Sequence, residues 1–159
     1  MALQQATFGA GCFWGVQDVF DREPGVLRTL AGYSGGRVVR PWYEEVCDGR
    51  TGDAEVVQVI FDPEQTSFER LLEVFWGCHD PTQLNRQGVD VGTQYRSVIF
   101  AHGEEQLAAA LASKAALESS GSHTRPVVTE IVAAGVFWRA EDYHQRYFAR
   151  LGIDPTCRR

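Results

Sequence analysis

Apolar and polar positions recur along the chain with two different periods, which predict a mixture of strands and helices. Residues 54–61 (AEVVQVIF) alternate from one face to the other, as a strand does. Residues 67–76 instead place leucine and aromatic side chains at helical spacing, and the first residue of this range, Ser67, can act as an N-cap. The same reasoning predicts further strands at 3–9, 26–33, 95–101 and 127–133, and further helices through 16–20 (stopped by Pro24), at 104–119 and at 141–151.

Two segments, 37–53 and 79–94, are predicted to be loops, apart from one helical turn at Tyr43–Cys47. Loops longer than a connection needs often carry function. The elements follow the order β-α-β, β-α-β, which resembles the split βαβ plait. We therefore expect an α+β fold, a two-layer α/β sandwich of the ferredoxin-like type with a mixed central sheet. No repeat or linker interrupts residues 1–159, so we expect a single domain with a short C-terminal tail at about 152–159.

The composition narrows the class of protein. With 159 residues and 44% hydrophobic content, the chain can bury a core without disulfides. Its formal net charge of -6 argues against nucleic-acid binding, which needs a basic face. Residues 1–6 lack the basic and apolar regions of a signal peptide, and no apolar run approaches the length of a membrane span. We therefore expect a cytoplasmic monomer that binds neither nucleic acid nor membrane.

The cysteines are widely spread and form no C-x-x-C pair. In a reducing cytoplasm such thiols are catalytic, metal-bound or unpaired rather than joined in structural disulfides. Zinc sites usually use closely spaced ligand pairs, and Cys78-His79 is the only adjacent candidate, so no metal is expected. The four cysteines are Cys12, Cys47, Cys78 and Cys157.

Cys12 has the surroundings expected of a reactive thiol. It lies in the stretch GAGCFWGVQDVF, at the junction of a predicted strand and a predicted helix. A helix N-terminus favours the thiolate, which is the nucleophilic form. Gly11 and Gly15 remove bulk beside the sulfur, and Phe13 and Trp14 can form an apolar wall. On this reasoning alone, a buried cysteine packed between two core aromatic rings stays a valid alternative.

Cys12 also lies in the first of six motifs that occur in order along the chain. They are GCFWG at 11–15, GYSGG at 32–36, YEEVC-x-G-x-TG-x-AE at 43–55, HDPT at 79–82, D-x-GTQYRS at 90–97 and AEDYHQ at 140–145. Together, over roughly residues 6–150, they resemble the A-type peptide methionine sulfoxide reductases. The resemblance implies reduction of the S epimer of methionine sulfoxide, free or in proteins, as a repair of oxidative damage.

In this family the residue matching Cys12 is the nucleophile, and its thiolate attacks the sulfoxide sulfur. Loss of the oxygen, finally as water, requires protons. Glu55 matches the family's acid, a carboxyl group that burial can keep neutral. Asp90 matches a second carboxylate that assists the site. Without the motifs, Glu55 would be read as an exposed charge and Asp90 as a loop aspartate.

The resemblance also assigns four aromatic side chains. Tyr43 and Tyr95 match a pair of phenols that can hydrogen-bond the sulfoxide oxygen, as an oxyanion hole does. Phe13 and Trp14 match the rings that hold the substrate methyl group. Read alone, each tyrosine would be a half-buried packing residue.

The family's recycling step converts the Cys12 sulfenic acid to a disulfide with a second thiol, which an external dithiol such as thioredoxin then reduces. Cys157, in the predicted tail, is the candidate resolving cysteine, and Cys47 is the alternative. No bound cofactor is implied. The expected partners are oxidised proteins or free methionine sulfoxide, and thioredoxin.

The chain departs from the family pattern at several positions. Asp53 stands where histidine is usual before Ala-Glu, and its charge lies two residues from Glu55. Arg40 and Trp42 replace smaller residues before the tyrosine of the third motif, and the tail lacks the usual glycine-rich segment with a further cysteine.

Three other functions use the same residues differently. A cysteine hydrolase or transferase would need His79 or His144 as a base beside the thiol. A binder of oxidised methionine would not need the reactive groups, and a thiol peroxidase would prefer peroxide to sulfoxide. We interpret His144 as structural, and we expect His102 and His123 to be solvated.

Overall fold

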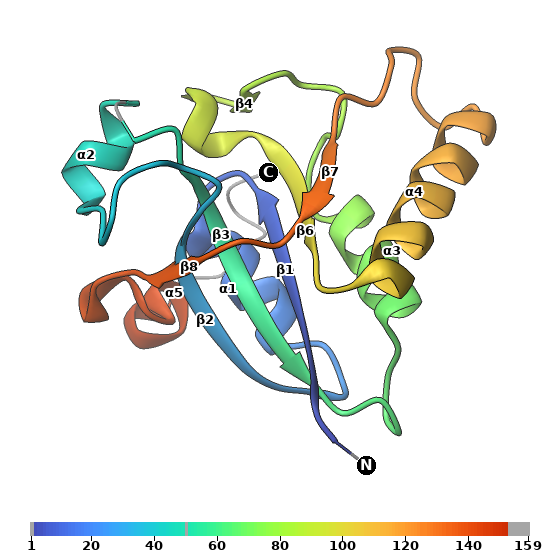
Figure 1. Cartoon of the computed structure of the whole chain (residues 1–159), viewed down its shortest axis with the longest axis horizontal. Coiled ribbons are helices and arrows are strands. Elements are labelled where there is room, and N and C mark those ends of the chain that lie inside the picture. Colours follow the sequence, from blue (N-terminus) through green and yellow to red (C-terminus); the bar gives the residue numbers. More distant parts are fainter. Residues whose placement is uncertain (1, 50, 153–159) are drawn as a thin grey trace.

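The computed structural model describes residues 2–49 and 51–152, and its centre is one six-stranded sheet with the order β7-β6-β1-β3-β2-β8 (Figure 1). The strands are β1 Gln4–Ala10, β2 Val26–Ser34, β3 Ala54–Phe61, β6 Ser97–Ala101, β7 Glu130–Ala133 and β8 Phe137–Arg139. A separate hairpin pairs β4 Arg86–Gln87 with β5 Asp90–Val91. The helices are α1 Phe13–Asp21, α2 Tyr43–Cys47, α3 Phe68–Gly77, α4 Glu104–Ser119 and α5 Tyr147–Leu151, with 3-10 turns η1 Thr93–Tyr95 and η2 Asp142–His144.

The sheet is mixed, as predicted. Strand β1 is antiparallel to both of its neighbours, β3 and β6, and β2 is antiparallel to β3 and β8. Only the pairing of β6 with β7 is parallel among the described strands. The expected mixed α and β class is therefore confirmed.

One face of the sheet is covered by α1 and α3 through a stack of phenylalanine rings. The ring of Phe8, on β1, lies 5.0 Å from that of Phe20 on α1 and 5.2 Å from that of Phe75 on α3. All three side chains are fully buried. Burial of such rings is the main favourable term in folding, and it fixes both helices on the face that lies behind the sheet in Figure 1.

The opposite face is covered by the connection between β7 and β8, which crosses in front of the sheet in Figure 1. Phe137, the first residue of β8, packs against a small apolar cluster that includes Val56 and Phe100. Close approach of β8 requires a glycine at position 32, because a Cβ there would lie 2.4 Å from the Phe137 ring. The glycine of the motif GYSGG thus has a packing role.

The C-terminal elements differ from those predicted. The helix expected at 141–151 is divided into η2 and α5, because Arg146 has a positive φ of 51° that a continuous helix does not allow. The strand expected at 95–101 begins at Ser97, since Tyr95 lies in η1, and the last strand of the expected set is shortened to β7. Strand β8 and the β4–β5 hairpin were not predicted.

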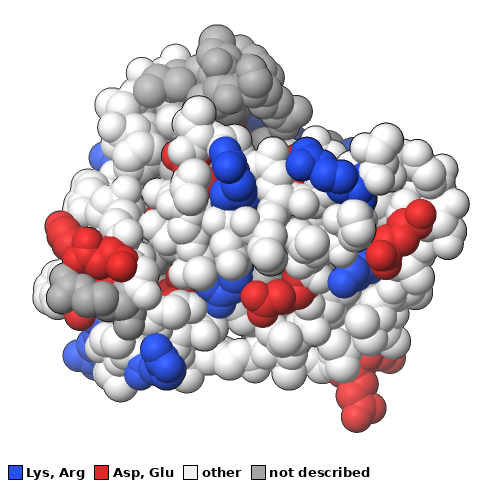
Figure 2. Space-filling model, turned by 90° about the horizontal axis from the view of Figure 1, so that it is seen from above, with Lys and Arg blue, Asp and Glu red and all other residues white. Residues whose placement is uncertain are grey.

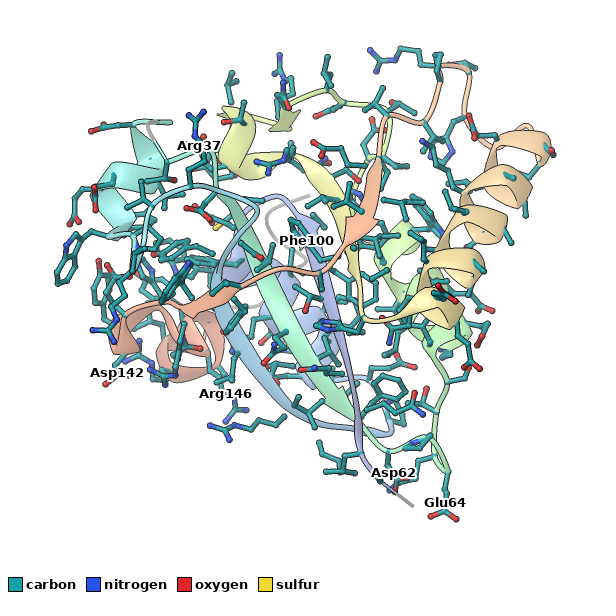
Figure 3. The ribbon with its side chains drawn as sticks, in the orientation of Figure 1. Arg37, Asp62, Glu64, Phe100, Asp142 and Arg146 are labelled. Carbon is teal, nitrogen blue, oxygen red and sulfur yellow. The ribbon has the colours of Figure 1, made fainter. Side chains whose placement is uncertain are left out.

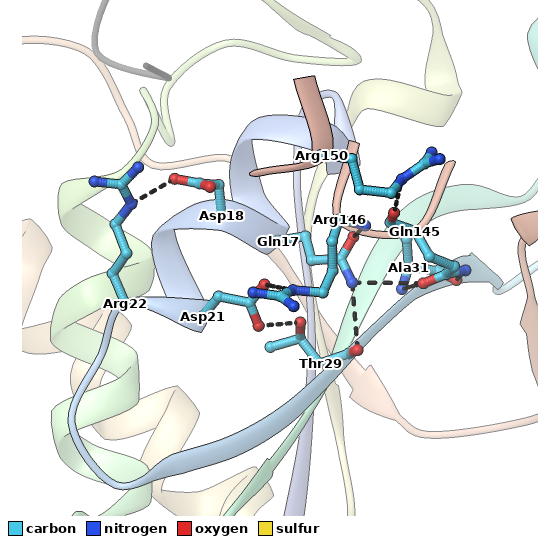
Figure 4. A network of polar contacts seen from close by, with 9 residues as sticks. All are labelled: Gln17, Asp18, Asp21, Arg22, Thr29, Ala31, Gln145, Arg146 and Arg150. Carbon is cyan, nitrogen blue, oxygen red and sulfur yellow. Dashed lines mark hydrogen bonds and ion pairs between the residues drawn. The ribbon is translucent and has the colours of Figure 1, made fainter. Parts of the chain in front are cut away.

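The side chain of Gln145 holds this irregular segment against the sheet (Figure 4). Its amide accepts from the Ala31 N–H at 2.9 Å and donates to the Ala31 carbonyl at 2.9 Å, as a neighbouring strand would. Gln17 on α1 completes the junction by accepting from the Arg146 N–H at 2.8 Å. The break in the helix therefore places two polar side chains where they satisfy backbone groups of β2 and of the C-terminal segment.

His79 joins the end of α3 to β6. Its Nδ1 donates to the Phe75 carbonyl at 2.8 Å, so its Nε2 accepts from the Ser97 hydroxyl at 2.7 Å. Burial lowers the pKa of His79 from 6.5 to about 4. His102 and His123, which we expected to be solvated, are both half-buried.

Charged side chains are scattered on the surface seen from above in Figure 2, where the coloured Lys and Arg side chains stand in small separate groups. Among the described residues, no helix has the length and apolar character needed to cross a bilayer.

We predict that Gln145→Ala lowers the free energy of unfolding by about 1–3 kcal/mol, because it leaves the Ala31 N–H without its acceptor, whereas the Ala31 carbonyl still accepts from the Ala140 N–H. Urea denaturation measures this loss. Gln65→Ala removes an exposed glutamine and serves as the control, with an expected change below about 0.5 kcal/mol. Equal stability of the two variants would contradict a bridging role for Gln145.

We predict that the protein loses stability as the pH falls from 6.5 towards 4. In this window the unfolded chain protonates His79 but the folded chain resists it, since a proton on Nε2 would lose the bond from Ser97. The loss should reach at most about 3 kcal/mol. Urea denaturation at several pH values checks it, and His79→Asn should flatten this part of the curve. Parallel curves for both proteins would assign the loss to other groups.

Candidate active site

Cys12 lies where β1 gives way to α1. Gly11 has a φ of 96°, a conformation suited to glycine, and turns the chain so that Cys12 becomes the N-cap of α1. The first helical hydrogen bond runs from the Val16 N–H to the Cys12 carbonyl at 3.4 Å. The side chain of Cys12 is half-buried at the positive end of this helix.

Glu55 lies beside this helix start. It is on β3, opposite Tyr33 of β2, and only 1% of it is exposed. Its Oε1 accepts a hydrogen bond from the Phe13 N–H at 3.2 Å. The alternative of an exposed charge is therefore wrong, and the carboxyl group lies next to the residue that follows Cys12.

Tyr43 of α2 and Tyr95 of η1 lie within electrostatic range of the same carboxyl group. Burial is the main cause that raises the pKa of each phenol, and Glu55, when ionised, raises both pKa values further. The pKa of Tyr95 is also raised by Asp90 and Cys12, which places these groups within electrostatic range. Both phenols therefore keep their protons near neutral pH and can donate hydrogen bonds.

Cys47, at the end of α2, shares a hydrogen bond with the side chain of Tyr43. Burial raises the pKa of the Cys47 thiol, and Glu55, when ionised, raises it further, although the bond with Tyr43 opposes the shift. None of the cysteines in the described ranges, Cys12, Cys47 and Cys78, is part of a disulfide.

Phe13 and Trp14 surround His144 of η2. Their ring centroids lie 5.1 Å and 5.7 Å from that of His144, and the Tyr43 ring lies 4.3 Å from it. The indole N–H of Trp14 donates to His144 Nδ1 at 2.9 Å, so the neutral imidazole carries its proton on Nε2. Trp14 also stacks on Tyr147 of α5, with a centroid distance of 3.9 Å. These rings form an aromatic cluster beside the helix start.

Sequence reasoning missed the side chain that holds Tyr43 in place. Glu141 accepts from the Tyr33 hydroxyl at 2.8 Å and from the Tyr43 N–H at 3.0 Å. Burial would raise the pKa of Glu141, but its hydrogen bonds outweigh burial and lower it. Glu141 and Tyr33 both lie within the six motifs, and this position in the motifs was the only indication in the sequence that they belong to the site.

A cavity of about 620 Å³ opens beside Cys12 and reaches Asp90 and His79. Both nitrogens of His79 are engaged by other groups, as described above. Within the described ranges, no group of three His, Cys, Asp or Glu side chains is arranged to hold a metal ion. The structure thus brings together Cys12, Glu55, Tyr43, Tyr95, Asp90, Phe13 and Trp14, whereas Cys157 lies outside the described residues.

Comparison with known proteins identifies related chains. The peptide methionine sulfoxide reductase MsrA of Geobacter sulfurreducens is 60% identical over 157 residues, which are 99% of this chain and 96% of that protein. The structure of Mxr1 from Saccharomyces cerevisiae in reduced form superposes with a TM-score of 0.89 at 31% identity, covering 96% of this chain and 87% of that one. Mxr1 in complex with Trx2 superposes with a TM-score of 0.65 at 24% identity over 91% of this chain and 84% of that one, a likeness of fold.

A family-wide sequence comparison covers nearly the whole chain. The family described as "Peptide methionine sulfoxide reductase" matches residues 4–158. This match includes all six motifs and every candidate site residue. The chain therefore belongs to the peptide methionine sulfoxide reductase family.

Proposed function

We propose that this protein is a peptide-methionine (S)-S-oxide reductase, which returns the S epimer of methionine sulfoxide, free or in proteins, to methionine. Family membership supports the reaction. The observation that carries the assignment to this site is the buried Glu55 carboxyl, hydrogen-bonded to the Phe13 N–H directly after Cys12. A proton source and a nucleophile at one helix start are what sulfoxide reduction needs.

In the first step the Cys12 thiolate attacks the sulfoxide sulfur. The N-terminus of α1 stabilises the negative charge of the thiolate before the attack. A carboxyl group as buried as Glu55 favours its neutral form, so it can give its proton to the sulfoxide oxygen. The attack forms a bond between the two sulfurs. The protonated oxygen then passes to the Cys12 sulfur as the S–O bond of the substrate and this new S–S bond both break, which yields the thioether and a cysteine sulfenic acid.

Tyr43 and Tyr95 act as hydrogen-bond donors to the sulfoxide oxygen while negative charge develops on it. Their raised pKa values support this role, because an ionised phenolate would repel the oxygen. Asp90, at the start of β5, assists from the cavity side. Phe13 and Trp14 hold the methyl group, since their rings are part of an apolar cluster.

Cys157 is the proposed resolving cysteine. Its thiol attacks the sulfenic sulfur of Cys12, and a disulfide forms as the hydroxyl leaves as water. Cys47 suits this role less, because its raised pKa disfavours the thiolate and its side chain is engaged by Tyr43. An external dithiol, which we propose to be thioredoxin as the Mxr1–Trx2 complex suggests, then restores both thiols.

The rival hydrolase would need a histidine base at Cys12. His79 directs its two nitrogens to Phe75 and Ser97, and His144 directs Nδ1 to Trp14. These bonds support the reductase over the hydrolase.

We also propose that the core is a ferredoxin-like split βαβ plait within a single domain. The order β6-β1-β3-β2, with α1 and α3 as crossover helices on one face, supports this proposal. The cytoplasmic location and the monomeric state stay predictions.

We predict that Glu55→Gln lowers kcat for S-epimer methionine sulfoxide by about 100-fold or more, because the amide cannot supply a proton. Methionine formation with excess dithiothreitol measures the effect. Glu44→Gln changes an exposed carboxylate of α2 and should stay within about twofold of the wild type. A Glu55→Gln enzyme of normal kcat would remove Glu55 from the chemistry.

We predict that one equivalent of the S epimer, without reductant, removes two thiols from the wild type and one from Cys157→Ser. The single loss reflects a sulfenic acid that finds no partner. Thiol titration combined with mass spectrometry of the modified peptides makes the measurement, and Cys12→Ser should lose none. Loss of the same two thiols in Cys157→Ser would assign resolution to another cysteine, and absence of methionine would overturn the reductase.

A further inference from the structure

Asp53 is a buried carboxylate, with only 2% of it exposed, and it does not line the cavity beside Cys12. Its Oδ1 accepts a hydrogen bond from the Gly36 N–H at 2.9 Å, across the entire loop between β2 and β3. Its own N–H donates to the hydroxyl of Thr51 at 3.1 Å. The Arg37 N–H donates to the Thr51 carbonyl at 3.0 Å. These bonds tie the two ends of the loop to each other.

The contact between Asp53 and Gly36 leaves no room for a side chain at position 36. A Cβ there would lie 2.4 Å from the Asp53 carboxylate and 2.5 Å from the Thr51 carbonyl. Close packing of this kind fixes the turn in position as well as satisfying its donor.

Arg96, from a second segment of the chain, lies near Asp53. It follows η1 directly, and its guanidinium donates back to the Thr93 carbonyl at 2.9 Å, across that turn. It also pairs with Glu130 of β7, with an Nε–Oε1 distance of 3.1 Å. Its charge bears on Asp53: burial raises the pKa of Asp53, and Arg96 opposes that shift together with the hydrogen bonds of Thr51 and Gly36.

We call Gly36, Thr51, Asp53 and Arg96 the Asp53 brace. The brace and the residues proposed for catalysis lie on the same three segments of chain. Tyr43 belongs to the loop that the brace closes, Glu55 is two residues after Asp53, and Tyr95 is the residue before Arg96.

Three residues of the brace, Gly36, Asp53 and Arg96, line a second cavity of about 500 Å³, which Phe100 and Arg37 also line. Both residues are labelled in Figure 3, with Arg37 at the end of the sheet near α2. Phe100 belongs to the apolar cluster on the face away from α1 and α3, whereas Cys12 lines the other cavity. A change in the brace therefore acts on the reaction through the position of other groups.

We propose that Asp53 is a positioning residue, which holds the loop of Tyr43 and the start of β3 in the geometry that sulfoxide reduction needs. The proposal rests on the proposed function of Tyr43 and Glu55. Misplacement of a reacting or donating group by about 1 Å can cost about 100-fold in rate. The brace positions the groups that protonate the sulfoxide oxygen, and it leaves the intrinsic reactivity of the Cys12 thiol unchanged.

The test compares the wild type with Asp53→Ala and Asp53→Asn, because the asparagine carbonyl can still accept from the Gly36 N–H. In a single turnover with the S epimer, Asp53→Ala should form methionine about 10–100-fold more slowly. Asp53→Asn should stay within about threefold of the wild type. Alkylation of Cys12 by iodoacetamide needs no proton donor, so its rate should be unchanged in both. Glu118→Ala, on the exposed surface of α4, is the control.

Hydrogen exchange of residues 35–55, followed by mass spectrometry, measures how firmly the brace holds the loop, independently of activity. Exchange should accelerate in Asp53→Ala and stay slow in Asp53→Asn. Gly36→Ala gives a second variant, which should resemble Asp53→Ala because the added Cβ displaces the carboxylate.

The outcomes separate the brace from the proposed function. An inactive wild type would overturn the proposed function, and the positioning role with it, while unchanged exchange in Asp53→Ala would show that no brace exists. An active wild type matched by an equally active Asp53→Ala would overturn the positioning role alone. A parallel fall in alkylation and methionine formation would also overturn it, since that pattern indicates general loss of structure.

Discussion

The hydrogen bond from the Phe13 N–H to Glu55 joins the start of α1 to the start of β3, and the candidate site depends on it. A carboxyl group that is almost fully buried needs such a partner, because burial without one is costly. The sheet makes the contact possible, since β3 lies directly beside β1 and so brings Glu55 next to the chain that leads into Cys12. The Phe13 N–H thus links the packing of the sheet to the candidate site.

The other parts of the site come from segments without regular structure of their own. Tyr43 lies in a helix of only five residues, and Tyr95 in a single 3-10 turn. Neither element has the length to be stable alone. Their positions are set by side chains of other elements, with Glu141 holding the Tyr43 N–H and Arg96 spanning the turn of Tyr95. Side-chain hydrogen bonds, rather than regular secondary structure, therefore fix the positions of Tyr43 and Tyr95.

Strong periodicity made the central part of the fold predictable from the sequence. The helix at Glu104–Ser119 and the strand at Ala54–Phe61 were predicted with the bounds that the structure has. The break at Arg146 was not predictable, because its backbone N–H is held by Gln17 of α1, a partner that only the fold supplies. Strand β8 was missed since its three residues become a strand only through pairing with β2. For the candidate site, motifs named the residues, but the roles of Glu141 and Asp53 depended on contacts across the chain.

The dependence of the site on Gln145 and His144 has a consequence for biosynthesis. A ribosome releases the chain from the N-terminus, so Cys12 leaves the exit tunnel long before the segment that carries His144. Until that segment emerges, β2 lacks the amide of Gln145 and Trp14 lacks its hydrogen-bond acceptor. In a nascent chain the surroundings of Cys12 therefore lack the aromatic cluster until the segment of His144 has left the ribosome.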